Sequence, residues 1–486
     1  MGKVLGHLQP QRVWELFEEI CGIPRPSKKE EKIIGWLIDF AKKNNLDYRR
    51  DRVGNVVLSK PASPGYEKKK MLVLQGHVDM VCEKNADVTH DFDKDPIQPF
   101  IDGDWVKAKG TTLGADNGIG MAFQLAILED KDLEHGPLEC LFTVDEETGL
   151  TGAFGLEPGF LKGRMLLNLD SEDDTELCIG CAGGLDTLAT FNYERVNNET
   201  DHIAFKVSVS GLKGGHSGDD INKGRANANK ILARILWNCE RMFEMRLAQI
   251  DGGNLRNAIA REAFAILTIP RKFKKDLEET IRQYAKDVGE EQKSNEPGVK
   301  INLHETAKPE CLIDYSTQSR LLGAIYGAPH GVLGMSADIP GLVETSTNLA
   351  SVKMTSKNIL VASSQRSSVA SLKKDAADMV SSVFQLAGAK VSHGDGYPGW
   401  APNMKSEILY VMRTKYKELF NEEPHVLAIH AGLECGLIGE KYPGMDMISF
   451  GPKMKGVHSP DEKLSIPSVQ KSWKFVLEVL KNIPEE

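Results

Sequence analysis

Three short apolar segments each end in acidic residues or histidine, and this pattern constrains the fold more than any other feature. The three are residues 71–75 leading to His77 and Asp79, 137–144 leading to Asp145-Glu146-Glu147, and 165–169 leading to Asp170. Apolar runs of this length are typical of buried strands in an α/β sheet. The carboxyl ends of neighbouring strands in such sheets meet at one edge, where ligands bind. The sequence therefore predicts a polar site at this edge.

The overall composition limits the class of protein. A chain of 486 residues is too long for one ordinary core and predicts two domains. The net charge of −9 argues against nucleic-acid partners, and no segment approaches the roughly 18 uninterrupted apolar residues of a membrane span. The amino terminus lacks the apolar core of a signal peptide, and the eight cysteines are sparse, as in a reducing compartment. We therefore expect a cytoplasmic protein without membrane or nucleic-acid partners.

The order of predicted strands and helices changes in the middle of the chain. Residues 1–186 and 396–486 contain the apolar strands that end in acids, and they predict an α/β domain with a mixed sheet. From 187 to 395, strands and amphipathic helices alternate with few acids at the strand ends, which indicates an inserted α+β domain. The order of elements recurs within this insertion and predicts two βαββαβ-like halves.

Local signals add detail to these domains. Ser27 followed by Glu30 predicts a capping box at the start of a helix. Residues 83–109 are rich in proline, glycine and charge, which predicts an irregular surface segment. Within the insertion we expect, among other elements, a helix over 225–247 and a strand over 358–363.

Two further segments supply polar residues for the expected site. Asp116 lies between Gly114 and Gly118, just before an apolar helical segment, and His458 lies in a turn-rich loop. An aspartate before a helix is most often an N-cap, so Asp116 alone would be weak evidence. Two histidines together with several strand-end carboxylates nevertheless suit a hydrolytic site with two zinc-class ions about 3.5–4 Å apart. Asp116 is the candidate for the shared ligand, since its glycine-flanked turn permits an unusual backbone geometry.

The chemistry of such a site assigns a role to each residue. The expected metal ligands are His77, Asp116, Glu147, Asp170 and His458. Glu146 lies beside a ligand and is the expected general base, which takes a proton from the attacking water and passes it to the leaving amine. Asp79 is expected to hydrogen-bond to the imidazole of His77 and orient it.

These motifs resemble, in order, the zinc metallopeptidase family that includes carboxypeptidase G2-like enzymes, aminoacylase and carnosinase. The matching elements are His77-Val-Asp79, Gly114-Ala-Asp116-Asn117-Gly118, Glu146-Glu147, Asn168-Leu-Asp170 and His458-Ser-Pro-Asp-Glu462. The resemblance extends from Trp14 to Pro484. It implies a two-zinc peptidase domain with an inserted lid, Mn or Co as alternative ions, and a homodimer. The implied activity is the hydrolysis of small unblocked dipeptides, including Xaa-His.

The resemblance also implies roles for polar residues outside the strand ends. His216 resembles the family histidine that stabilises the oxyanion from the lid, and Arg366 resembles the arginine that binds the substrate carboxylate. For a lone loop histidine or arginine, an exposed side chain without a role is the common alternative. The other implied substrate contacts are Asn254, Asn257 and Asn348, for the carboxylate or backbone, and Glu434, near the substrate amine.

Three alternatives to a dipeptidase remain on the sequence alone. The nearest is an N-acyl-amino-acid deacylase or a tripeptidase with the same metal chemistry. A metal-binding protein without activity is the second, although Glu146 and every expected ligand are present. A thiol oxidoreductase built on Cys178-Ile-Gly-Cys181 is the third, although a single CxxC is a weak signal.

Overall fold

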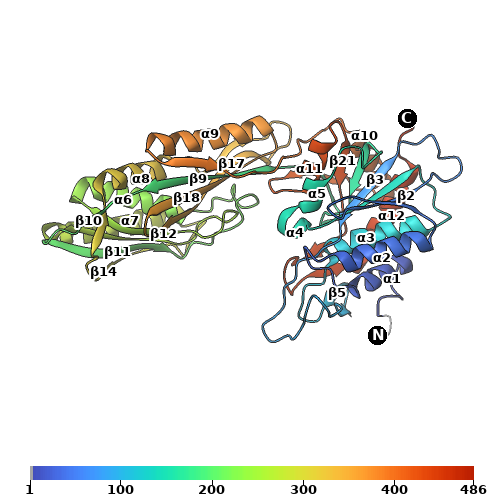
Figure 1. Ribbon diagram of the computed structural model, residues 1–486, viewed down its shortest axis with the longest axis horizontal. Coiled ribbons are helices and arrows are strands. Elements are labelled where there is room, and N and C mark those ends of the chain that lie inside the picture. The colour runs from blue at the N-terminus through green and yellow to red at the C-terminus, as the bar shows by residue number, and fades with distance from the viewer. Residues whose placement is uncertain (1–3) are drawn as a thin grey trace. The chain divides into compact units, whose positions relative to one another are not determined.

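The computed structural model describes residues 4–486, which form two compact units. Unit 1 comprises the chain up to Gly180 together with Trp400–Ala428 and Leu433–Glu486, and unit 2 comprises Cys181–Gly399 and Ile429–Gly432. Unit 2 thus begins a few residues before the expected insertion of 187–395, and it takes in a short segment from much later in the chain. Figure 1 labels many of the elements of both units.

An eight-stranded mixed sheet forms the centre of unit 1, as predicted. In the order of pairing its strands are β1 (Asp47–Arg50), β2 (Val56–Lys60), β6 (Leu138–Thr143), β3 (Leu72–His77), β7 (Met165–Asn168), β21 (Asp446–Ser449), β8 (Glu176–Cys181) and β20 (His425–Ile429). The strand β3 lies between β6 and β7 and runs parallel to both. Every residue of these three strands is buried. Since successive residues point to opposite faces, both faces of this part of the sheet are covered.

Helices cover this sheet, and one of them is itself buried. The longer helices are α1 (Gln11–Cys21), α2 (Glu31–Lys43), α3 (Ala115–Glu129), α10 (Glu407–Phe420) and α12 (Ile466–Lys481). The shorter helices are α4 (Glu146–Gly149), α5 (Thr151–Gly155) and α11 (Glu434–Lys441). All residues of α3 except Asp116 and Glu129 are buried, because this helix is apolar around most of its circumference and packs against both α1 and β3.

The predicted capping box before α2 is wrong. The helix begins one residue after Glu30, and no side chain caps it. The hydroxyl of Ser27 instead donates to Asp79, and Glu30 accepts the backbone N–H groups of Lys28 and Asp145. Both side chains are thus engaged by segments that follow the central strands. Contacts at this edge of the sheet outweigh the local preference for helix capping.

A second sheet lies partly in the segment that was expected to be irregular. Within residues 83–109, β4 (Pro99–Asp102) and β5 (Trp105–Ala108) form an antiparallel hairpin. The remaining strands, β22 (Met454–Lys455) and β23 (Lys463–Ser465), come from far along the chain, and β23 pairs with β5. The prediction is therefore wrong for these two strands: they pair locally with each other, and only the pairing of β5 with β23 comes from a distant segment.

A nine-stranded sheet forms unit 2, and the helices of the unit lie along one side of it in Figure 1. In order its strands are β14 (Lys300–Glu305), β11 (His202–Ser210), β13 (Ala263–Pro270), β12 (Arg246–Gly252), β17 (Val343–Met354), β18 (Asn358–Ser367), β9 (Gly183–Asn192) and β19 (Lys390–His393), with β16 (Gly331–Met335) also paired to β17. The helices are α6 (Ala228–Phe243), α7 (Lys274–Gln292), α8 (Tyr315–Gly327) and α9 (Ala370–Leu386). A separate ribbon pairs β10 (Arg195–Asn197) with β15 (Cys311–Ile313).

The strand order divides this sheet into two βαββαβ halves that join where β12 pairs with β17. The first half is β11-α6-β12-β13-α7-β14, and the second is β9-α8-β17-β18-α9-β19. If the strands of each half are numbered 1 to 4 along the chain, the strands of the first half lie across the sheet in the order 4-1-3-2. Those of the second half lie in the reverse order, 2-3-1-4. The opening strand of the second half, β9, precedes the entire first half in the chain. The first half is therefore inserted within the second.

Two predicted boundaries in unit 2 are wrong. The helix expected over 225–247 ends at Phe243, because Glu244 adopts a left-handed conformation with φ of 53°, and the following residues form β12. The strand expected over 358–363 continues far enough to include Arg366. This extension is polar in sequence and resembles a loop, but β17 and β9 pair with it on both sides.

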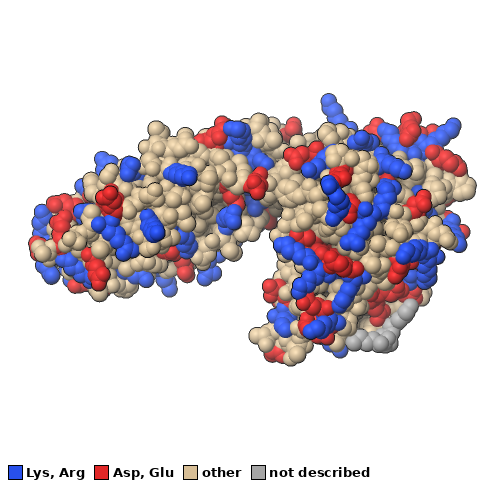
Figure 2. All heavy atoms as spheres, in the orientation of Figure 1, with Lys and Arg blue, Asp and Glu red and all other residues tan. Residues whose placement is uncertain are grey.

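Two surface properties complete the description. Among residues 4–486, no helix has the length and apolar character needed to span a bilayer. On the face drawn in Figure 2, lysine and arginine side chains are interspersed with aspartate and glutamate side chains in both units. On this face the acidic side chains are therefore not gathered in one region.

Candidate active site

His77 lies at the carboxyl end of β3, and only 1% of its side chain is exposed. Its Nδ1 atom lies 3.3 Å from Oδ1 of Asp79. Its Nε2 atom lies 3.0 Å from Oδ1 of Asp116 and 3.3 Å from Oδ1 of Asp170. Asp79 therefore occupies one side of the imidazole and leaves the other nitrogen to face two further carboxylates.

Asp79 is fully buried and binds more than the imidazole. Its Oδ1 accepts the backbone N–H of Glu146 at 3.0 Å, and its Oδ2 accepts the backbone N–H of Glu147 at 3.2 Å and the hydroxyl of Ser27 at 2.7 Å. Burial opposes the ionisation of Asp79, but the hydrogen bonds, with that of His77 the strongest, lower its pKa to about 2. The ionised carboxylate thus orients His77 and also holds the start of α4.

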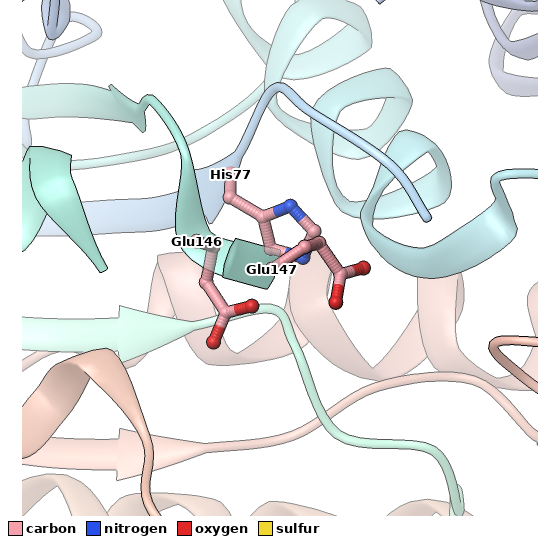
Figure 3. A group of neighbouring side chains, drawn as sticks. All are labelled: His77, Glu146 and Glu147. Carbon is pink, nitrogen blue, oxygen red and sulfur yellow. The ribbon is translucent and has the colours of Figure 1, made fainter. Parts of the chain in front are cut away.

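The three consecutive acids at the end of β6 point in different directions. Asp145 accepts the hydroxyl groups of Thr148 and Thr151, so its carboxylate serves the local turn. Figure 3 shows Glu146 and Glu147 beside the ring of His77, with their carboxylates pointing different ways. This divergence separates charges that would otherwise repel one another strongly.

Asp116 lies in the first turn of α3 with a non-helical backbone conformation (φ −78°, ψ 114°). It does not cap the helix, whose N-cap position is occupied by Gly114 in a left-handed conformation. Its Oδ1 faces Nε2 of His77 at 3.0 Å, and its Oδ2 faces Nε2 of His458 at 3.3 Å. The Asp116 carboxylate therefore lies between the two imidazoles.

His458 comes from the loop between β22 and β23. It adopts a left-handed conformation with φ of 61°, and 54% of its side chain is exposed. Its Nε2 atom lies 3.1 Å from Oε2 of Glu147. Hydrogen bonds with Asp116 and Glu147 raise the pKa of His458 to about 11. The loop thus brings a second imidazole to the acids at the strand ends.

The described residues contain two groups of candidate metal ligands that share Asp116. One group is His77, Asp116 and Asp170, and the other is Asp116, Glu147 and His458; the ligand atoms of each lie within 4.8 Å of one another. Among residues 4–486, the buried atoms Oδ1 of Asp170 and Oε1 of Glu147 have no hydrogen-bond partner. Burial, reinforced by the neighbouring acids, raises the pKa of Asp170 to about 7. Imidazole nitrogens and converging carboxylates are the donor set of zinc-class ions, so these residues fit two divalent cations.

Two other acids lie near these groups. Burial raises the pKa of Glu146 well above its usual range, and burial also raises the pKa of Glu434, to about 7. Oε2 of Glu434 accepts hydrogen bonds from Gln75 at 2.6 Å and Thr143 at 2.7 Å. Its Oε1 is buried and, within residues 4–486, lacks a hydrogen-bond partner. Glu434 is thus anchored to the same strands that end at His77 and Glu146.

Comparison with known proteins places the chain among peptidases. The model of peptidase family M20/M25/M40 matches residues 73–482. The chain belongs to this family. It is 43% identical over 480 residues to the cytosol non-specific dipeptidase of Escherichia coli (strain K12), which covers 99% of each chain. The aminoacylhistidine dipeptidase from Vibrio alginolyticus has a structure with a TM-score of 0.94 and 45% identity, covering 100% of this chain and 99% of that one.

More distant solved structures share the fold alone. A tripeptidase from Staphylococcus aureus matches with a TM-score of 0.57 and 17% identity, covering 98% of this chain and 99% of that one. Membership of the M20 family confirms the predicted family resemblance, the α/β fold class and the prediction of a metallopeptidase. The five predicted ligands of this M20 peptidase all lie in the two groups that share Asp116.

In unit 2 of the M20 peptidase, His216 and Arg366 lie side by side. Nδ1 of His216 lies 3.2 Å from the backbone N of Asp219 and 3.1 Å from Oδ2 of the same residue. Nε2 of His216 lies 3.4 Å from Nη2 of Arg366, which can donate a hydrogen bond to it. Arg366 is 7% exposed and also donates to the hydroxyl of Tyr397.

The three asparagines predicted to bind substrate have contacts of their own in unit 2. Asn348 is buried, and its Nδ2 donates to a backbone carbonyl in the segment that follows Asn257, at 2.8 Å. Asn257 is exposed, and its own carbonyl accepts the N–H of Ser217 at 2.8 Å. Asn254 is also exposed and accepts a hydrogen bond from Lys353 at 2.9 Å. Asn348 and Asn257 thus support the loop that carries His216.

The cysteine pair considered as a redox site lies inside a strand. Cys178 and Cys181 belong to β8 and are 3% and 0% exposed. Reactive thiol pairs are accessible and lie in electropositive surroundings, which a buried strand does not provide. The M20 fold therefore gives no support to a thiol oxidoreductase.

Sequence reasoning missed two buried charged residues next to the candidate ligands. Arg25 and Glu462 are each 2% exposed and contact the turn that leads to Asp116. Glu462 ends one of the matched motifs, and Arg25 stands between two prolines near an apolar helix. These were the available signals, but neither indicates which backbone groups the side chains would bind.

Proposed function

We propose that this M20 peptidase is a dipeptidase that uses two zinc ions to hydrolyse unblocked dipeptides, including Xaa-His. The position of the Asp116 carboxylate between His77 and His458 is the observation that carries the proposal. The substrate class is supported by the 43% identical dipeptidase of Escherichia coli and by the aminoacylhistidine dipeptidase structure. When bound, two zinc-class ions polarise the peptide carbonyl and lower the pKa of water toward about 7.

Glu146 is the proposed general base. With His77 and Glu147 it forms a third group of candidate ligands, but it belongs to neither of the two groups that share Asp116, and we assign its carboxylate to proton transfer. It takes the proton of the attacking water and delivers it to the leaving amine. Asp79 keeps this geometry by binding the backbone N–H of Glu146 and the imidazole of His77.

Residues of unit 2 and Glu434 are proposed to bind the substrate. The imidazole of His216 is proposed to stabilise the oxygen of the tetrahedral intermediate, and the adjacent guanidinium of Arg366 is proposed to bind the substrate carboxylate. Asn254, Asn257 and Asn348 complete the proposed carboxylate and backbone contacts. Glu434 offers a buried carboxylate oxygen that suits the free amino group of an unblocked dipeptide.

The location and assembly of the enzyme are also proposals. The relative named a cytosol dipeptidase supports activity in the cytosol. We propose a homodimer in which unit 2 mediates the association, and sedimentation velocity tests it. A monomer at assay concentration that retains full activity would exclude this assembly.

A substrate panel tests the proposed activity. The panel is Ala-His, β-Ala-His, Gly-Leu, Leu-Gly-Gly and N-acetyl-Met, each assayed with zinc-loaded and chelated protein. We expect rapid, chelator-sensitive cleavage of the dipeptides alone. Preferred cleavage of N-acetyl-Met or Leu-Gly-Gly would move the substrate class to a deacylase or a tripeptidase, and bound metal without any cleavage would contradict an enzymatic role.

The variant Glu146→Gln tests the general base separately. It removes the proton acceptor while it keeps the shape of the side chain, so kcat should fall by about 10²–10⁴-fold. Metal content should remain two ions per chain because Glu146 is not among the proposed ligands. Normal turnover in this variant would refute the assignment.

A further inference from the structure

Glu462 binds every backbone N–H of the turn that leads into Asp116. The carboxylate is 2% exposed and belongs to the same loop as His458. The donors are the N–H groups of Leu113 and Gly114, at 2.6 and 3.0 Å from Oε2, and of Ala115 and Asp116, at 2.8 and 3.3 Å from Oε1. Glu462 therefore ties the loop of one histidine to the turn that carries the shared carboxylate.

Arg25 binds the same turn through its carbonyl side. Its Nη1 donates to the backbone carbonyls of Val78 at 3.0 Å and Asp79 at 2.6 Å, directly after His77. Its Nη2 donates to the carbonyl of Gly114. The guanidinium presents several donors in a fixed fork, which suits a link between two separate backbone segments. Arg25 therefore ties the segment after the other histidine to the turn before Asp116.

Two glycines make room for this guanidinium. A Cβ atom at Gly114 would lie 2.5 Å from Nη2 of Arg25, and a Cβ atom at Gly118 would lie 2.8 Å from it. Gly114 also has a φ of 68°, which side chains rarely adopt. The glycines that flank Asp116 in the sequence therefore accommodate Arg25 as well as the turn.

We propose that Arg25 and Glu462 are positioning residues that hold Asp116 at a fixed place between His77 and His458. Each links the same turn to a different histidine-bearing segment, so together they set the distance between the two ligand groups. The inference rests on the two-ion centre of the proposed function. Loss of either link should weaken the binding of one ion while the ligands themselves remain.

Metal titration of the metal-free protein tests this inference. Zn²⁺ binding is followed by calorimetry and Co²⁺ binding by its visible absorption, for the parent, Glu462→Gln and Arg25→Lys. The glutamine keeps the shape of Glu462 but turns an NH₂ group toward backbone donors, and the lysine cannot span two segments. We expect one of the two ions to bind about 10–100-fold more weakly in both variants, as is typical for residues that support metal ligands.

Glu139→Gln is the matched control. Glu139 is 1% exposed in the same unit and accepts the backbone N–H groups of Lys162 at 2.8 Å and Gly163 at 3.1 Å, away from the candidate ligands. Its variant loses a comparable buried carboxylate and should still bind two ions with the affinity of the parent. A similar loss of affinity in this control would show that general destabilisation is the cause and would overturn the inference.

The remaining outcomes separate the inference from the proposed function. Parental affinity for both ions in Glu462→Gln and Arg25→Lys would overturn the inference, whereas a parent that binds fewer than two ions would refute the proposed centre. If thermal unfolding shows that either variant is not folded, Gly118→Ala displaces the guanidinium and keeps both charges. In that variant too, the affinity for one of the two ions should fall. Unchanged affinity for both ions would overturn the inference.

Discussion

Replacing Asp79 by asparagine tests how a buried carboxylate that holds no ion supports the catalytic centre. The two oxygens of Asp79 accept the backbone N–H groups of Glu146 and Glu147 and the hydroxyl of Ser27, and they face the imidazole of His77. An amide keeps the shape but has one acceptor oxygen instead of two. Its NH₂ group must therefore oppose at least one of the donors.

The contacts determine the expected magnitude. A hydrogen bond to a charged group is worth about 1.5–3 kcal/mol, and a buried donor left unpaired costs a similar amount. One lost backbone contact and one weakened contact with His77 thus amount to about 3–6 kcal/mol. At about 1.4 kcal/mol per factor of ten, kcat/KM of Asp79→Asn should fall by roughly 10²–10⁴-fold.

The assay is kcat/KM for Ala-His with zinc-saturated protein, together with metal content and thermal unfolding. Ser27→Ala is the control, because it removes one hydrogen bond to Asp79 and leaves the backbone contacts intact. On the same scale this one hydrogen bond is worth about 1.5–3 kcal/mol, or roughly 10–150-fold in rate, so the control should lose less activity than Asp79→Asn. The reasoning is refuted if Asp79→Asn, with two ions bound, stays within about threefold of the parent, since that is under about 1 kcal/mol.

Three further predictions concern stability. In Gly76→Ala a Cβ atom would lie 2.1 Å from Oδ1 of Asn117, so urea unfolding should show a loss of about 1–3 kcal/mol; an unchanged midpoint would contradict the contact. Chelation should lower the thermal midpoint of the parent, because ions at a hundredfold excess over Kd stabilise the folded state by about 2.7 kcal/mol, but not that of Asp116→Ala. Burial, with the charge of Arg366, lowers the pKa of His430 from 6.5 to about 4. Because the unfolded chain binds a proton at this residue more readily than the folded protein does, the free energy of unfolding is highest above pH 6.5 and falls toward pH 4. Urea unfolding at both pH values should therefore show up to about 3 kcal/mol less acid sensitivity in His430→Gln, and equal sensitivity would count against this assignment.

The sequence was informative wherever a residue's role follows from its place at the end of a buried strand. His77, Glu147 and Asp170 could be predicted to converge, because buried parallel strands are continuous apolar runs whose carboxyl ends share one edge. Asp116 and His458 could be added because they complete a donor set that the strand ends leave unfinished. The same signals were insufficient for element boundaries that depend on distant partners.

The residues that could not be predicted act through the backbone of other segments. Glu462 accepts the N–H of Leu113, which lies 349 residues away in the chain. Nothing in the sequence around Glu462 indicates this distant partner. The end of β18 around Arg366 resembles a loop because its residues are polar. It is nevertheless a strand, because it pairs with β9, which lies far earlier in the chain. Ser27 and Glu30 match a capping box, yet contacts with Asp79 and Asp145 are formed instead. In each case a long-range contact overrides a local preference.

Unit 2 is inserted within unit 1, and the first half of unit 2 is inserted within its second half. These two insertions also fix the order in which parts of the chain become available during translation. The first half of unit 2, from β11 to β14, is continuous in sequence, so its strands are the first in unit 2 that can all pair. The strand β9 cannot pair with β18 until β18 has been synthesised. Likewise, the site around His77 lacks its second imidazole until His458 has been synthesised. A nascent chain that has not yet released residue 458 carries four of the five proposed ligands. The group of Asp116, Glu147 and His458 can therefore be completed only after synthesis has passed residue 458.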